Sequence, residues 1–157
     1  MHTSSEKSQE QFFQDLAIQW PELMQKSQIQ YIEIGLGWFN LIDTLCSLIC
    51  RDLDNAKRRL KYAMEYPANN PNVTIADLEK EVEEELENLP IIVQIKEKFG
   101  GLRFYVDNAS DRIYNFIDFA ETLSNTTCEI CGSPGGHSGG FWIKTLCKKH
   151  AEKEASP

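Results

Sequence analysis

Four residues near the C-terminus have the types and the spacing of metal ligands. Their arrangement is C-x2-C-x15-C-x2-H, formed by Cys128, Cys131, Cys147 and His150. Thiolates and imidazoles are preferred zinc ligands, and four of them complete a tetrahedron that leaves no position for water. A closed site of this kind stabilises a fold and does not activate water, so the spacing predicts one structural Zn2+ ion per chain.

The residues around the four ligands indicate how they converge. Gly132 follows the second cysteine, as in a zinc knuckle whose turn directs backbone N–H groups at the thiolates. Cys147 and His150 are three residues apart, so the first turn of a short helix places both on one face. With a hairpin expected around residues 141–143, the whole segment is predicted to be treble-clef-like.

Three further residues are alternatives for metal or redox chemistry. His137 lies in a glycine-rich loop and is an alternative to His150 as the fourth ligand, although a solvated loop histidine is the simpler interpretation. Cys46 and Cys50 are four residues apart in an expected helix, which suggests a second metal or a redox pair. No histidine or carboxylate constellation accompanies them, so we expect two buried free thiols.

A second candidate site is the basic face of a β-hairpin predicted over residues 91–106. Gly100 and Gly101 are predicted to form its type I′ turn, which needs positive φ at both positions. Side chains alternate between the two faces of a strand. The polar face then carries Lys96, Lys98, Arg103 and Tyr105, and the apolar face carries Ile91, Val93, Ile95, Phe99, Leu102, Phe104 and Val106, interrupted by Glu97.

The polar face of this hairpin predicts a binding surface for a small anionic ligand of the nucleotide type. Arg103 can hold a phosphate through two hydrogen bonds, and Tyr105 can stack on a base. The alternative is that these cations are solvated or pair with an acidic segment nearby in the sequence. A weaker anion-binding candidate is the Gly-x-Gly-Trp sequence of residues 35–38, which a turn before a core tryptophan explains more simply.

Helices must position both candidate sites. The spacing of apolar residues predicts a helix over residues 12–24, interrupted at Pro21, and a central helix over residues 38–63. A third helix is expected to begin after Thr74, the first residue of a capping box, and a fourth is expected over about residues 111–124.

The composition is that of a folded protein with one core. The chain has 157 residues, of which 41% are hydrophobic and 10% aromatic. We expect an α+β fold in two parts: a helical domain over residues 1–126 that includes the hairpin, and a zinc-binding module over residues 127–157 packed on it. The polar N-terminus and the lack of a long apolar run predict a cytoplasmic protein with reduced thiols.

The net charge of −8 argues against nonspecific binding to duplex nucleic acid or anionic membranes. The acid is concentrated in residues 77–87, where seven carboxylates accompany one lysine, so this segment carries −6 and the rest of the chain −2. A local basic site therefore remains compatible with the composition.

Three segments resemble a family of small uncharacterised proteins encoded by bacteriophages and prophages. They are Gly37-Trp38-Phe39 with Leu41-Ile42, the stretch from Gln94 to Tyr105 that contains KFGGLRFY, and the cysteine-rich segment from Cys128 to His150. The chain departs from the family pattern at Asn40, where an acidic residue is more usual. No activity is established for this family, so the resemblance implies a phage origin and transfers no catalytic residue.

The residues assemble no Ser/His/Asp or Cys/His catalytic arrangement, and we expect a binding protein that is not an enzyme. Its expected partner is a small anionic ligand or a host protein, and the resemblance implies a role in countering host defence. The pattern does not distinguish a monomer from a homo-oligomer. The alternative is a nucleic-acid-associated zinc-finger factor, which Lys144, Lys148 and Lys149 favour and the overall charge opposes.

Overall fold

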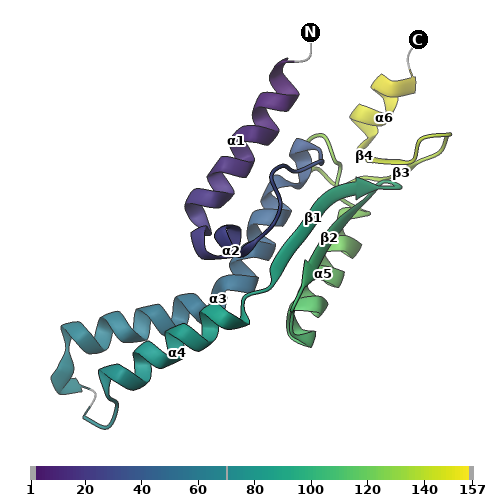
Figure 1. Cartoon of the computed structure of the whole chain (residues 1–157). Helices are drawn as coiled ribbons and strands as arrows, with labels where there is room; N and C mark the ends of the chain where they lie inside the picture. Colours follow the sequence, from purple (N-terminus) through teal and green to yellow (C-terminus); the bar gives the residue numbers. More distant parts are fainter. Residues whose placement is uncertain (1–2, 70, 156–157) are drawn as a thin grey trace.

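The computed structural model describes residues 3–69 and 71–155, which form an α+β fold, as predicted. Six α-helices, two 3-10 turns and two antiparallel hairpins follow one another along these residues (Figure 1). They are α1 (Thr3–Gln19), α2 (Pro21–Lys26), η1 (Leu36–Trp38), α3 (Phe39–Glu65), η2 (Pro67–Asn69), α4 (Ile75–Asn88), β1 (Ile91–Lys98), β2 (Gly101–Asp107), α5 (Asp111–Ser124), β3 (Gly136–Ser138), β4 (Lys144–Leu146) and α6 (Lys148–Ala155).

The helices begin and end at the local signals predicted from the sequence. Pro21 occupies the first turn of α2, where its missing N–H costs no hydrogen bond, so the first helical segment is divided there. The central helix α3 ends at Glu65, just before Pro67. Thr74 caps α4, because its hydroxyl oxygen accepts a hydrogen bond from the backbone N–H of Asp77 at 3.1 Å.

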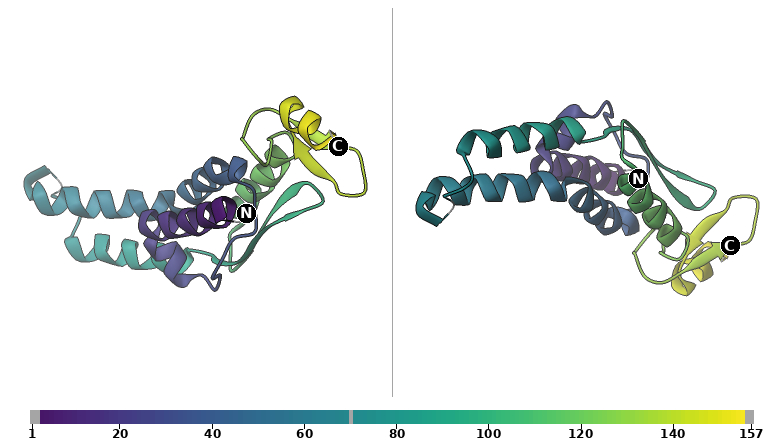
Figure 2. Two further views of the ribbon diagram at one scale, coloured as in Figure 1. Left: turned by 90° about the horizontal axis from the view of Figure 1, so that it is seen from above. Right: turned by 90° about the horizontal axis from the view of Figure 1, so that it is seen from below.

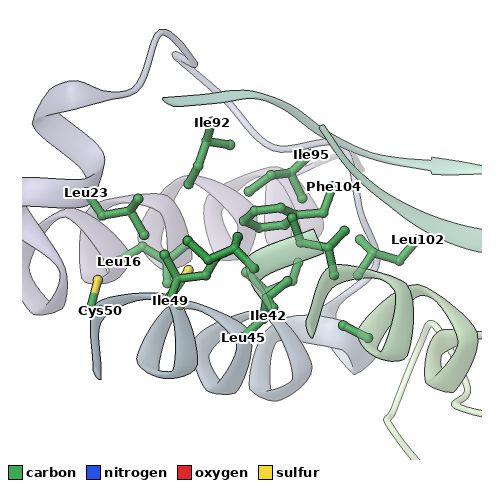
Figure 3. Packing of buried hydrophobic residues seen from close by; sticks show 14 of the residues in the cluster. Leu16, Leu23, Ile42, Leu45, Ile49, Cys50, Ile92, Ile95, Leu102 and Phe104 are labelled. Carbon is green, nitrogen blue, oxygen red and sulfur yellow. The ribbon is translucent and has the colours of Figure 1, made fainter. Parts of the chain in front are cut away.

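The hydrophobic core lies between the β1–β2 hairpin and the helices below it. Figure 3 shows Ile92, Ile95 and Phe104 pointing from the strands toward α3, where Ile42 and Ile49 meet them. Helices α1 and α2 close one side of this core, and α5 packs beneath β2 on the other side. The central helix therefore supports both the hairpin and α5.

Both edges of the β1–β2 hairpin are covered by other segments that form hydrogen bonds with the strand backbone. Along β1, the segment before η1 runs parallel to the strand, with hydrogen bonds from Glu33 N to Ile95 O at 3.2 Å and from Glu97 N to Glu33 O at 2.8 Å. Along β2, helix α5 takes the place of a strand. The Ser124 hydroxyl accepts from Leu102 N at 2.8 Å, and a Glu121 carboxylate oxygen accepts from Phe104 N at 2.9 Å.

The turn of this hairpin differs from the prediction. Lys98 pairs with Gly101, so the two turn residues are Phe99 and Gly100, with φ of 52° and 75°, and Gly101 is the buried first residue of β2. The half-buried Glu97, which required a partner on the apolar face, accepts a hydrogen bond from Gly100 N at 2.7 Å. The prediction of a Gly100-Gly101 turn was therefore wrong by one residue.

A bulge in β1 changes which residues of this strand face the core. The register shifts between Ile92 and Gln94, so Val93 is exposed and Ile92 is fully buried. The prediction had placed Val93 on the apolar face and is wrong there. Phe99, also expected on that face, is exposed because it belongs to the turn. Ile91, also expected on that face, is only half-buried and pairs with the exposed Asp107, whereas Ile95, Leu102, Phe104 and Val106 lie on the predicted face.

Replacing Phe99 by Asn is expected to stabilise the protein by about 1 kcal/mol, because Asn adopts positive φ with less strain than a bulky residue. Replacing it by Ile is expected to destabilise the protein, since β-branched residues resist this conformation. Urea denaturation of the two variants measures both effects. A less stable Asn variant would show that the Phe99 side chain contributes packing that outweighs the strain.

The far halves of α3 and α4 form an arm that projects away from both hairpins (Figure 2). Some of its charged side chains pair with one another, as Arg59 does with Glu81. The acidic residues of α4 therefore lie beside α3, and the alternative that they neutralise the hairpin cations does not hold for Arg103, whose acidic neighbour is Glu121 of α5.

No helix in residues 3–69 or 71–155 is long and apolar enough to cross a membrane.

Candidate metal centre

The four predicted metal ligands lie together in the C-terminal module, which we define as residues 127–155. Cys128 and Cys131 belong to a tight turn after α5, closed by hydrogen bonds from Gly132 N to Cys128 O and from Cys128 N to Ser133 O, both 2.8 Å. Cys147 follows β4, and the first turn of α6 brings His150 to the same side, with a hydrogen bond from His150 N to Cys147 O. Two local turns therefore present two ligands each.

The separations between the ligand atoms match one tetrahedral ion. All four atoms lie within 4.8 Å of one another. Cys131 Sγ is 3.8 Å from Cys147 Sγ, and His150 Nδ1 is 3.5 Å from Cys128 Sγ and 3.2 Å from Cys147 Sγ. Metal–sulfur bonds of about 2.3 Å and metal–nitrogen bonds of about 2.0 Å give tetrahedral S···S edges of about 3.8 Å and S···N edges of about 3.5 Å. The cluster is compatible with a metal site.

The electrostatics of the cluster favour a bound cation. Hydrogen bonds from the Ser133 side chain and backbone lower the pKa of the exposed Cys131 thiol to about 6, so that it ionises at neutral pH. A backbone hydrogen bond from His150 lowers the pKa of Cys147, but desolvation and the adjacent Cys131 and Cys128 raise it above its usual value. Neighbouring thiolates repel one another, and a divalent ion between them removes that repulsion.

The alternative ligands lie elsewhere. His137 is exposed in β3, with Nε2 3.3 Å from Asn125 Oδ1, and is not part of the cluster. Cys46 and Cys50 are buried free thiols in α3, as expected. Burial raises the pKa of the Cys50 thiol to about 12 and that of Cys46 still further, so both stay protonated.

A glycine loop before α3 holds the knuckle against the helical core. Gly37 N donates a hydrogen bond to Glu129 O at 2.9 Å, within the turn that carries Cys128 and Cys131. A Cβ atom at Gly35 would lie 2.0 Å from Glu129 O, and one at Gly37 would lie 2.1 Å from Cys128 O. The glycines are required by this close backbone approach, a reason that the sequence analysis missed because the knuckle lies about ninety residues further along the chain.

Two buried side chains complete the attachment of the module. The indole N–H of Trp38 donates to Thr127 O at 2.8 Å, so the core tryptophan also fixes the start of the knuckle. Thr145 of β4 is fully buried and donates its hydroxyl to Gly100 O in the hairpin turn at 2.5 Å. The β1–β2 turn and the C-terminal module are thus joined directly.

The predicted second hairpin is present, but its aromatic residues lie in the loop. β3 and β4 pair from Gly136↔Leu146 to Ser138↔Lys144, whereas Phe141, Trp142 and Ile143 belong to the connection between them. All three are exposed. The predicted hairpin around residues 141–143 is therefore present, with these residues in its loop.

The structure places the four residues of the basic hairpin face on one side of β1–β2. Lys96 pairs with Arg103 across the strands, and the Lys96 ammonium lies 5.8 Å from the centre of the Tyr105 ring. Lys98 is exposed at the end of β1. Arg103 is half-buried; it donates to Leu102 O at 2.7 Å and lies 4.0 Å from Glu121. The guanidinium is therefore held in place along the strand.

No family model, no curated protein and no solved structure matches this chain.

Proposed function

We propose that Cys128, Cys131, Cys147 and His150 bind one Zn2+ ion and that this ion is structural. Three thiolates and one imidazole are soft and borderline donors that suit zinc better than magnesium or calcium. Four protein ligands fill a tetrahedron, so water has no place on the ion. Bound zinc would tie the knuckle to α6 and thereby hold β4 against the turn of the β1–β2 hairpin.

We further propose that the chain is a binding protein, not an enzyme, and that its ligand is a compact phosphate-bearing molecule on the basic hairpin face. The observation that supports this is the cross-strand pair of Lys96 and Arg103 beside Tyr105 on one face of an acidic chain. An anion between the two cations lowers their mutual repulsion, and a held guanidinium gives it a preferred orientation.

The resemblance to phage and prophage proteins supports a role in the cytoplasm of an infected host. A phage protein that sequesters a nucleotide messenger would blunt a defence that depends on that messenger. A host protein docked on the same face is the competing partner.

Replacing Arg103 by Ala is expected to weaken ligand binding at least tenfold, about 1.4 kcal/mol, because charge-assisted hydrogen bonds to phosphate are lost. Isothermal titration calorimetry with mono-, di- and cyclic nucleotides provides the measurement. Arg58→Ala, which removes the same charge from the exposed arm, is the matched control and should bind as the wild type does. If no nucleotide binds, and wild type but not Arg103→Ala captures a host protein, the hairpin is a protein interface instead.

A further inference from the structure

Three exposed aromatic side chains lie at the end of the molecule opposite the α3–α4 arm. We call them the aromatic tip: Phe99 in the β1–β2 turn, and Phe141 and Trp142 in the β3–β4 loop. Phe99 is 69% exposed, Trp142 is 75% exposed and Phe141 is fully exposed. Figure 1 shows the two hairpins meeting at this end, and both views of Figure 2 agree.

The two loops that carry the tip are in direct contact. The position of a Cβ atom on Gly100 lies 3.1 Å from Ile143 Cγ2 and 3.2 Å from the carbonyl carbon of Lys144. The hydrogen bond from Thr145 to Gly100 O fixes this contact. Phe99 and Trp142 each adjoin a residue of this contact in the sequence, so the two segments that carry the aromatic tip lie side by side.

Folding alone does not account for Phe99. Its φ of 52° is unfavourable for a bulky residue, and type I′ turns prefer Asn or Gly at this position. Since the ring is largely exposed, burial does not compensate for the strain. A strained backbone that presents an exposed aromatic ring points to a role in recognition.

One cation without a carboxylate partner among the described residues, Lys98, lies at the tip, whereas Lys144 beside it pairs with Glu154. Lys98 lies over the Phe99 ring, 5.5 Å from its centre, and the basic hairpin face continues from there along β1 and β2. Lys148 and Lys149 of α6 are exposed and form no ion pair within the described part of the chain. On the arm, by contrast, several cations are neutralised, as Arg59 is by Glu81. The tip and the hairpin face thus combine exposed rings with Lys96 and Lys98, which form no ion pair among the described residues, and with Arg103, which lies 4.0 Å from Glu121.

From this juxtaposition we propose that the aromatic tip stacks on nucleobases, and that the ligand of the basic hairpin face is therefore a nucleobase-bearing phosphate. Exposed rings interleaved with cations are how proteins hold unpaired bases and their phosphates, whatever the base sequence. A duplex hides the faces of its bases and does not fit this surface. This proposal rests on the proposed phosphate-binding function: the hairpin face binds the phosphate, and the aromatic tip binds the nucleobase attached to it.

The test compares three probes on the full-length, zinc-loaded protein: single-stranded dT10, ATP and inorganic tripolyphosphate. The first two carry bases and the third does not. Wild type is expected to bind a base-bearing probe at least about tenfold more tightly than tripolyphosphate, since stacking adds to each phosphate contact. Tighter binding of dT10 than ATP identifies a single strand as the source of the ligand, and the reverse identifies a free nucleotide.

Trp142→Ala and Phe99→Asn are each expected to weaken the base-bearing probes about tenfold and to leave tripolyphosphate unchanged. Phe99→Asn is the sharper variant, because it should fold at least as well as wild type. Tyr62→Ala removes an exposed aromatic from the arm and should have no effect. Quenching of tryptophan fluorescence by dT10, lost in Trp142→Ala, gives an independent signal.

Two results overturn the inference while leaving the proposed function standing. One is equal binding of all three probes, unaffected by the tip variants. The other is that a DNA duplex, added as a fourth probe, binds as tightly as dT10. If none of the three probes binds, both the inference and the proposed phosphate-binding function fail.

Discussion

Cys131→Ser is expected to lose bound zinc and to destabilise the protein by about 3 kcal/mol, a fall in melting temperature of about 6 to 12 °C for a chain of this size. Cys131 is the most suitable ligand for this test because it is exposed, whereas Cys128 and Cys147 are buried. Its replacement by serine leaves no cavity, so the loss reports the metal site and not the packing of the core.

The destabilisation should spread beyond the cluster. Without the ion, the knuckle keeps its hydrogen bond from Glu129 N to Thr145 O at 2.9 Å but loses its link to Cys147 and His150, which weakens the support of the contact between Thr145 and the β1–β2 turn. Elemental analysis should find one zinc per wild-type chain, and thermal denaturation with and without a chelator should reproduce the effect of the substitution.

His137→Ala is the matched control for the zinc prediction. This histidine is the alternative fourth ligand by sequence, but it is exposed and lies outside the cluster, so zinc content and melting temperature should stay at the wild-type values. Less than half an equivalent of zinc in the wild type, or an unchanged melting temperature in Cys131→Ser, would contradict a structural zinc site.

Gly37→Ala is expected to destabilise the protein by about 3 kcal/mol and to weaken its hold on zinc. The new Cβ would lie 2.1 Å from Cys128 O, 2.5 Å from Gly132 N and 2.8 Å from Cys131 N. All three are backbone atoms, so no change of side-chain rotamer relieves the overlap. The knuckle must move away from η1, which also displaces two of the four metal ligands.

Gly136→Ala is the control for this substitution, since a Cβ there meets nothing within 4 Å. It should change the free energy of unfolding by less than about 0.5 kcal/mol. Urea denaturation followed by circular dichroism measures the stabilities, and competition with a chromophoric chelator measures zinc retention. Equal denaturation midpoints for the two variants would show that the glycine loop does not press on the knuckle in solution.

The choice of turn residues could not be read from the sequence, although both hairpin strands could. A turn at Gly100-Gly101 and one at Phe99-Gly100 leave the same side chains on the same faces, because moving the turn by one residue changes the pairing by two. The hydrophobic pattern therefore does not discriminate between them. The observed turn is the one in which Glu97 accepts from Gly100 N and Thr145 donates to Gly100 O.

The sequence by itself determined the features that depend on neighbouring residues. Helix boundaries at Pro21 and Thr74, and the two pairs of metal ligands, arise from contacts within one or two turns of chain, so their signals are local. The aromatic tip, the role of Gly37 and the anchoring of Trp38 on Thr127 were decided only by the tertiary structure. Each joins segments that are tens of residues apart, and the spacing of residues along a chain carries no information about which distant surfaces will meet.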